Sequence, residues 1–356
     1  MARSHDDLSG MNIINPALQR HSAQRPVNLP SSFPDVKTAR IKRRAHLDAL
    51  THLMPIPDAI PELVDEKEVH VPAADGFKVP VTVYSPKSTG SANREAGLPV
   101  IILMHEGGWH LGDRKDEEMN ARLFVRDLGC VVLNVEYRLG PEHPFPTGVL
   151  DCYNVLQSLC YSAKAFHNLA DPSKGIVLGG SSAGGNLAAV LAHKAREDRL
   201  NPPVTGQWLS VAALLPEACC PDRYRPEYVS LAENQDDPVI GKMSTKRLGV
   251  LLMELQIPED DPLFTPFAVN LYPPRTFEAD GRPPLAKAFI QVAGMDPLRD
   301  QSLIYERALR EEWGTETRLE IYSGYGHMFW TNWPEMEESK KFWKDMVDGM
   351  RWLLAR

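Results

Sequence analysis

The stretch from Ile176 to Leu187 reads IVLGGSSAGGNL, an apolar run that stops at two glycines and restarts in small residues typical of a closely packed helix. Within it, Gly180-x-Ser182-x-Gly184 fits a nucleophile elbow, a sharp strand-to-helix turn that exposes a serine hydroxyl. Small flanking residues let strand and helix approach without a side-chain clash. The serine also comes to a helix N-terminus, where unpaired backbone N–H groups can bind an anion. The stretch predicts Ser182 as a nucleophile beside its own anion site.

The elbow needs a base, because a serine hydroxyl is a weak nucleophile that is usually activated by a histidine held by a carboxylate. In strand-elbow hydrolases the chain order is Ser, then Asp or Glu, then His. Two histidines follow Ser182: His193, on the expected elbow helix, and His327. His327 lies in a glycine-containing loop after the strand-like segment Thr317 to Tyr322, a suitable setting for a catalytic side chain. We expect His327 to be the base.

The acid should follow the preceding strand, which we place at Ala288 to Val292. Asp296 comes directly after the end of that strand, whereas Asp300 lies near the start of the amphipathic stretch Leu303 to Trp313. An acidic residue at such a position is ordinarily a helix-terminus or solvated charge. We therefore favour Asp296 and keep Asp300 as the alternative.

An oxyanion hole is the fourth part, because attack on an ester carbonyl places negative charge on its oxygen. The strand-like run Val100 to Met104 leads into HEGGW at residues 105–109, where glycines let backbone N–H groups approach a substrate. Trp109, Phe329 and Trp330 lie beside the expected catalytic elements, either as pocket walls or as core residues.

These motifs resemble the hormone-sensitive-lipase-like family of α/β-hydrolase carboxylesterases, whose oxyanion loop reads HGGG and whose elbow reads GDSAGGN. Residues 136–146, EYRLGPEHPFP, resemble the YRLAPEHPFP block of that family, and DPLRD at 296–300 matches too. The matches extend over about residues 68–330 in family order. The resemblance implies an α/β-hydrolase fold with Ser182 as nucleophile, Asp296 as acid, His327 as base and N–H donors from Gly107, Gly108 and Ala183.

Two residues depart from the family pattern. Glu106 replaces the first glycine of the family's triplet, and Ser181 replaces the aspartate before the nucleophile. An ionised carboxylate turned inward would oppose an oxyanion by like-charge repulsion, so we expect Glu106 to turn away or to be hydrogen-bonded. Ser181 lies one residue off the elbow apex, which favours a neutral replacement over a second nucleophile.

The rest of the chain predicts an α/β fold, a mostly parallel twisted sheet with helices on both faces. A chain of 356 residues with 43% hydrophobic content can bury a large core. Strand-like segments alternate with helix-like stretches after an antiparallel hairpin, as in such sheets. The expected strands are Glu68–Val71, Phe77–Tyr84, Val100–Met104, Cys130–Val135, Ile176–Leu178, Trp208–Leu215, Ala288–Val292 and Thr317–Tyr322.

Two regions fall outside this alternation. The catalytic domain is predicted at 66–216 and 276–356. The segments 1–65 and 217–275, the latter rich in prolines and charges, remain. The family resemblance implies that they combine into a helical cap, which would exclude water and shape the acyl pocket.

Charge and cysteine usage narrow the partners. A formal net charge of −8 argues against nucleic acid, and the one basic run, Lys37 to Arg44, is expected to be a solvated helix face. The five cysteines show neither a disulfide framework nor metal-binding spacing, and the N-terminus has no apolar leader region. We expect a cytoplasmic enzyme without metal, organic cofactor or membrane span. Its oligomeric state, a homodimer included, is left open.

The predicted reaction is two-step acyl transfer from a small-molecule ester to water through Ser182. A thioesterase, lactonase or acyl transferase that acts on a natural-product acyl chain would use the same residues. A non-catalytic small-molecule receptor is known on the same fold, but the presence of Ser182, Asp296 and His327 weighs against it.

Overall fold

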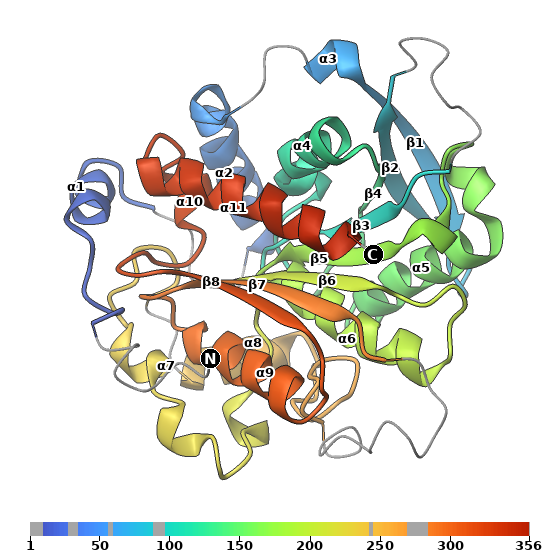
Figure 1. The fold of residues 1–356 in the computed structure, drawn as a ribbon. Coiled ribbons are helices and arrows are strands. Elements are labelled where there is room, and N and C mark those ends of the chain that lie inside the picture. Colours follow the sequence, from blue (N-terminus) through green and yellow to red (C-terminus); the bar gives the residue numbers. More distant parts are fainter. Residues whose placement is uncertain are drawn as a thin grey trace.

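A mostly parallel sheet forms the centre of the molecule (Figure 1). The computed structural model describes residues 10–27, 35–55, 60–87, 97–241, 245–268 and 284–355. Across these residues the sheet has eight strands in the order β1-β2-β4-β3-β5-β6-β7-β8. The strands are β1 (Val64–Pro72), β2 (Lys78–Pro86), β3 (Val100–Met104), β4 (Val131–Val135), β5 (Ile176–Ser181), β6 (Gly206–Ser210), β7 (Lys287–Ala293) and β8 (Thr317–Tyr322).

The strand pairing confirms the predicted hairpin and parallel sheet. β1 pairs with β2, and β2 with β4, in antiparallel fashion, and every later pairing from β4 to β8 is parallel. All residues of β3, β4, β5 and β6 are buried. Continuous apolar strands of this kind are expected where helices cover both faces of a parallel sheet.

Helices cover both faces (Figure 1). On one face α4 (Glu118–Leu128) and α11 (Glu337–Leu354) pack in a core cluster around Trp208 and Phe289. On the other, α5 (Thr147–Phe166), α6 (Ala183–Glu197) and α9 (Arg299–Glu311) pack in a second cluster around Ile102 and Leu178. Shorter elements are α3 (Ile60–Leu63), α10 (Phe329–Asn332), η2 (Thr51–Leu53), η3 (Arg114–Glu117), η4 (Pro172–Lys174), η5 (Glu217–Cys219) and η6 (Arg225–Glu227).

The strand predicted over Trp208–Leu215 is wrong in its second half, because β6 ends at Ser210. Val211 has φ of 42°, which a β-branched residue rarely adopts and which turns the chain out of the sheet. Residues 211–215 are nevertheless all buried or half-buried, with the N–H groups of Leu214 and Leu215 donating to Gln301. Apolar sequence alone does not separate such a buried turn from a strand.

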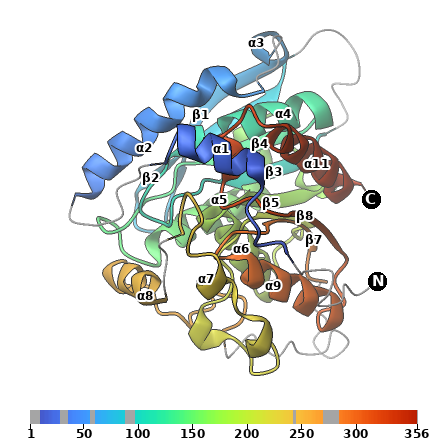
Figure 2. The same cartoon turned by 90° about the vertical axis from the view of Figure 1, so that its left-hand side faces the viewer.

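The segments outside the sheet carry α1 (Pro16–Gln24) and α2 (Val36–Leu50) before β1, and α7 (Ser230–Glu233) and α8 (Thr245–Glu254) between β6 and β7. Figure 2 shows α2 and α8 on the same side of the molecule. Both contact loops at the carboxyl ends of the strands. Arg40 of α2 donates to His110 O and Gly140 O, and α8 contributes Leu252 to an apolar cluster against which Trp109 packs. The cap boundaries themselves stay a prediction.

Candidate active site

The turn between β5 and α6 holds Ser182 in a strained conformation. Its φ of 53° and ψ of −116° lie outside the regions that residues with a Cβ ordinarily occupy. The N–H of Ser182 donates to Ser210 O at 2.8 Å, and Ser182 O accepts the N–H of Asn186 at 3.0 Å. Neighbouring backbone thus fixes the strained residue from both sides, as expected of a functional turn.

Two glycines of the elbow are required by close backbone approach. A Cβ at Gly180 would lie 2.2 Å from Met104 O, and one at Gly184 would lie 1.9 Å from the same oxygen. Either contact is far below van der Waals distance, so only glycine lets α6 begin against the end of β3. The elbow is thereby held next to the loop that follows β3.

The three residues predicted as a triad lie together. His327 Nε2 is 3.0 Å from Ser182 Oγ, and His327 Nδ1 is 2.7 Å from Asp296 Oδ2. Asp296 follows β7 and His327 follows β8, so both loops start at the same edge of the sheet as the elbow. All three side chains are buried, with Ser182 the most exposed at 9%. The imidazole therefore bridges a hydroxyl and a carboxylate, which is the arrangement of an activated serine.

The surroundings of His327 favour its protonated form. Burial alone would lower the pKa of His327, but the charge and the hydrogen bond of Asp296 outweigh burial, so that this pKa lies above its usual value. The more distant carboxylates of Asp237 and Glu106 act in the same direction. An imidazolium formed during the reaction is therefore stabilised where it forms.

The loop after β3 presents backbone donors beside the elbow. Gly107, Gly108 and Trp109 have φ of 121°, 59° and 61°, and the turn is closed by Leu111 N–H on Gly107 O at 2.8 Å. A Cβ at Gly107 would lie 2.3 Å from Leu111 O. Within the described residues, no hydrogen-bond acceptor faces the backbone N–H groups of Gly107, Gly108 and Ala183. These are the donors that the sequence predicts for an oxyanion.

Asp300, the alternative acid, makes its hydrogen bonds to α7 and Arg299. Asp300 accepts the N–H groups of Val229 and Ser230 at 2.7 and 2.6 Å and pairs with Arg299 at 2.7 Å. It therefore caps the start of α7, while Asp296 contacts the imidazole.

The other two polar candidates of the elbow region also lie apart from the imidazole of His327. Ser181 is buried within β5 and pairs with Ser210 in the sheet. His193 lies 3.0 Å from the hydroxyl of Tyr305, and burial lowers the pKa of His193 to about 3.

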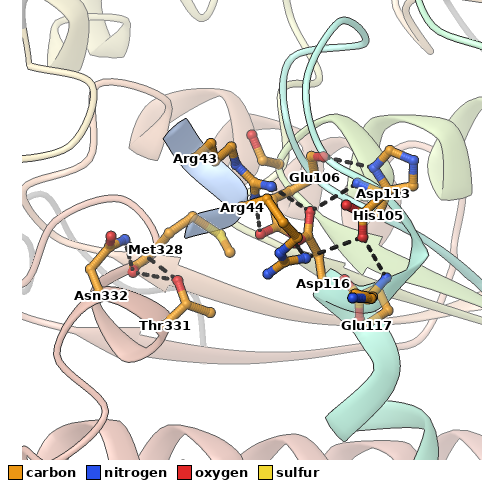
Figure 3. Close-up of polar contacts among 12 residues, drawn as sticks. Arg43, Arg44, His105, Glu106, Asp113, Asp116, Glu117, Met328, Thr331 and Asn332 are labelled. Atoms are coloured by element: carbon orange, nitrogen blue, oxygen red, sulfur yellow. Dashed lines mark hydrogen bonds and ion pairs between the residues drawn. The ribbon is translucent and has the colours of Figure 1, made fainter. Parts of the chain in front are cut away.

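Glu106 is buried and hydrogen-bonded, in agreement with the expectation from sequence. Its Oε1 accepts from Arg43 Nη2 of α2 at 2.6 Å (Figure 3). Burial and the nearby Asp116 raise the pKa of Glu106 to about 7, against the opposing effect of Arg43.

The basic run Lys37 to Arg44 is only in part the solvated face that the sequence indicated, because Lys37 and Lys42 are exposed but the arginines are not. Arg43 is only 7% exposed and pairs with both Glu106 and Asp116, and Arg44 pairs with Asp116 at 2.9 Å (Figure 3). The i, i+3, i+4 spacing of Arg40, Arg43 and Arg44 puts them on one face of α2, which meets the acidic residues after the oxyanion loop. Charge counting along the sequence does not show that those acidic residues lie opposite.

Asp237 is a site residue that sequence reasoning missed. It is buried, and its carboxylate accepts the backbone N–H of His327 at 2.6 Å as well as those of Val239 and Ile240. Burial and the charge of Asp296 raise the pKa of Asp237 to about 7. In sequence it is one acidic residue among several in a charged segment, and only the folded chain brings it to His327.

An apolar pocket begins next to the catalytic elements. Trp109 lines it from the loop after β3, Leu187 from α6 and Leu255 from the residue that follows α8. The candidate walls Phe329 and Trp330 do not line it, since both are fully buried in the core, where the Trp330 ring stacks on Phe342 at 3.7 Å. Both belong to the buried cluster that α11 forms with one face of the sheet.

Two further observations concern cofactors and membranes. In the part of the chain that the structure describes, no group of three or more His, Cys, Asp or Glu side chains is arranged to hold a metal ion. Over the same residues, no helix combines the length and apolarity needed to cross a bilayer.

Known proteins resemble this chain over most of its length. A family described as having the α/β-hydrolase fold matches residues 101–331. An AB hydrolase superfamily protein of Schizosaccharomyces pombe is 33% identical over 85% of this chain and 83% of its own. Carboxylesterase NlhH of Mycobacterium tuberculosis is 32% identical over 79% of this chain and 80% of its own. The crystal structure of vibralactone cyclase matches 97% of this chain and 96% of its own with a TM-score of 0.81 and 30% identity.

Proposed function

Because this chain belongs to the α/β-hydrolase fold family, in the hormone-sensitive-lipase-like group that its motifs resemble, we propose that it hydrolyses carboxylic esters through an acyl-enzyme on Ser182. It is an esterase-like serine hydrolase in class. The observation that carries the proposal is the continuous hydrogen-bonded chain from Ser182 through His327 to Asp296, beside three backbone N–H groups without a partner in the described residues.

The first half-reaction forms the acyl-enzyme. His327 Nε2 takes the proton of Ser182 Oγ as that oxygen bonds to the ester carbonyl carbon, and the carbonyl electron pair moves onto its oxygen. The N–H groups of Gly107, Gly108 and Ala183 stabilise the resulting oxyanion. When the carbonyl re-forms, the bond to the alkoxy oxygen breaks, and the alcohol leaves with the proton from His327.

The second half-reaction releases the acid. Water loses a proton to His327 Nε2 as its oxygen attacks the acyl carbon, and the same donors hold the second oxyanion. Collapse returns the proton to Ser182 and frees the carboxylic acid. Asp296 orients the imidazole and stabilises its positive charge in both halves. The donors and the triad supply every proton and charge that these steps need.

The apolar pocket supports a substrate with an apolar group beside its ester. Trp109, Phe264 and Leu255 offer it aromatic and aliphatic surface, and the Trp109 and Phe264 rings meet edge to face at 5.1 Å. Since the loop after α8 supplies one wall, we propose that residues 217–275, together with 1–65, form the cap over the site. A small-molecule ester is the expected partner.

Replacement of Ser182 tests the proposal. Ser182→Ala should lower kcat for short-chain p-nitrophenyl esters by at least about a thousandfold, and it should abolish labelling by a fluorophosphonate probe. Ser181→Ala, one residue away in the same strand end, is the matched control and should retain labelling. Wild-type turnover that persists in Ser182→Ala would refute the assignment. Tight ligand binding without turnover or labelling would instead favour the receptor alternative.

A second candidate reaction has one specific observation in its favour. The structural neighbour named vibralactone cyclase is named for ring formation. With an acyl chain that carries its own hydroxyl, that hydroxyl can replace water as the attacking group, and a lactone leaves Ser182. Mass spectrometry of products from a hydroxy-acyl ester would distinguish a lactone from the free acid, and thioesters in parallel would test the thioesterase alternative.

We also propose a cytoplasmic location, since all five cysteines are free thiols, which suits a reducing compartment. Cell fractionation would test it. Light scattering would show whether the chain forms a homodimer.

A further inference from the structure

We propose that Arg43 and Glu106 are a positioning pair: cap helix α2 neutralises a carboxylate built into the oxyanion loop, so that the loop accepts an oxyanion only while α2 is docked. The proposal rests on the proposed esterase function, because it concerns the donors Gly107 and Gly108. Neither Arg43 nor Glu106 touches the reacting atoms in the mechanism above.

The backbone of Glu106 sets the direction of one donor. Its carbonyl oxygen lies 2.9 Å from His105 Nδ1, and that carbonyl belongs to the same peptide group as the Gly107 N–H. A trans peptide is planar with its C=O and N–H pointing in opposite directions, so fixing one fixes the other. The Tyr137 hydroxyl donates to His105 O at 2.8 Å, and the two rings stack at 4.1 Å. Any rotation of the Glu106 carbonyl group therefore rotates the Gly107 N–H with it.

The side chain of Glu106 is held from outside the catalytic domain. Arg43 bridges two carboxylates, with Nη2 at 2.6 Å from Glu106 Oε1 and Nη1 at 2.6 Å from Asp116 Oδ2 (Figure 3). Both Arg43 and Glu106 are buried, and the latter is 5% exposed. Arg40, on the same face of α2, donates to His110 O at the far end of the oxyanion loop. One helix thus holds both ends of that loop.

Charge makes the contact more than a packing interaction. Breaking a buried pair by removing one partner leaves an uncompensated charge, which is far more costly than the loss of an exposed pair. Without Arg43, an ionised Glu106 would stand one residue from the oxyanion donors and would oppose the developing charge. With Arg43 in place, the pair is neutral at that point.

Other charged groups also face Glu106. Asp116 of η3 raises the pKa of Glu106, and Arg44 of α2 lowers it. Glu106 in turn raises the pKa of the buried Glu117, at the end of η3. It also raises the pKa of His327 and of Tyr137. The pKa of Glu106 already lies near 7, so loss of Arg43 would raise it further. Without Arg43, the Glu106 carboxyl group would then be neutral at low pH and ionised at high pH.

The test measures kcat and KM of the full chain on a p-nitrophenyl ester across pH. Arg43→Met should lower kcat by about thirtyfold near pH 9 and by less than about fivefold near pH 6, with KM within about threefold. Adding Glu106→Gln should restore kcat at high pH to within about fivefold of Glu106→Gln alone. Arg44→Met, which removes a neighbouring charge without touching Glu106, is the matched control and should stay within about threefold of wild type at every pH.

Outcomes separate the inference from the proposed function. If wild type hydrolyses the ester and Ser182→Ala does not, the proposed function is supported. The variants of Arg43, Arg44 and Glu106 then test only the role of the Arg43–Glu106 pair. Equal losses in Arg43→Met and Arg44→Met, or a loss that is independent of pH and unrelieved by Glu106→Gln, would overturn the inference. Should Arg43→Met not fold, Arg43→Gln carries the same comparison, because glutamine removes the positive charge but keeps an amide donor.

Discussion

At the scale of single residues, Asp237 links the segment proposed as a cap to His327, the proposed base. Its carboxylate accepts the His327 N–H at 2.6 Å and contributes to raising the pKa of His327. It accepts the backbone N–H of His327, while the ring nitrogens contact Asp296 and Ser182, so it acts through position and charge. No other acidic residue of the described cap contacts the backbone of His327.

The pH dependence of activity should reveal the effect of the Asp237 charge on His327. The base must be neutral to accept a proton, so kcat/KM should rise with pH through the pKa of His327, with a midpoint above the usual value of about 6.5. Asp237→Asn removes a charge that raises this pKa, so the midpoint should move toward lower pH. Pre-steady-state or kcat/KM profiles of both proteins measure it, with Asp236→Asn as the neighbouring control. A midpoint that is unchanged or moves upward in Asp237→Asn would contradict this reading.

At the scale of elements, hydrogen bonds to Asp300 hold the start of α7 in place. That carboxylate accepts two N–H groups at the start of α7, and Ser230 Oγ in return accepts the Asp300 N–H at 3.2 Å. This reciprocal arrangement joins the cap insertion to the first turn of α9.

Replacing the two aspartates near β7 should separate structure from catalysis. Asp300→Ala should lower the free energy of unfolding by about 2 kcal/mol, because the N–H groups of Val229 and of the buried Ser230 lose their acceptor, and it should keep kcat within about tenfold. Asp296→Ala should lower kcat by at least about a thousandfold. Thermal melts and ester assays measure both, with the half-exposed Asp348→Ala as the stability control. A larger kcat loss in Asp300→Ala than in Asp296→Ala would reverse the two roles.

The elements show how far sequence reasoning reaches. The elbow, the two loops with Asp296 and His327, and the parallel strands follow from local patterns, because strand-to-helix glycines and apolar runs are encoded within a few residues. The end of β6 does not, because Val211 leaves the sheet through a backbone conformation that its side chain disfavours.

Long-range pairs are the other part that the sequence hides. Arg43 and Glu106 are 63 residues apart, and Asp237 and His327 are 90 apart. Each of these charged residues has an unremarkable local context, and their contacts form only when α2 and the segment after β6 pack against the loops of the sheet.

At the scale of the whole molecule, buried carboxyl groups make stability depend on pH. The pKa of Asp237 and of Glu106 is raised to about 7, and that of the buried Glu117 lies well above its usual value. A group whose folded-state pKa is raised binds its proton more tightly in the folded state. Its stabilising contribution is therefore complete below the unfolded-state pKa and is lost as pH rises through the folded-state pKa.

The resulting prediction concerns the melting temperature between about pH 4 and pH 8. For Asp237 the folded-state pKa near 7 corresponds to about 4 kcal/mol of stability lost over this window. Asp237→Asn should flatten the decline, so that the difference in melting temperature between wild type and variant narrows or inverts as pH rises. Calorimetry at matched ionic strength measures it. Parallel curves for the two proteins would show that Asp237 does not titrate in this range.

The contacts of Arg43 and Asp237 bear on how such enzymes can be recombined. One residue comes from α2 and the other from the segment after β6, and each holds a different half of the catalytic apparatus. A chimera that receives a foreign lid to change its substrate range would lose both supports at once. A design that exchanges α2 and the segment after β6 should therefore transfer Glu106 and the loop with His327 together with them.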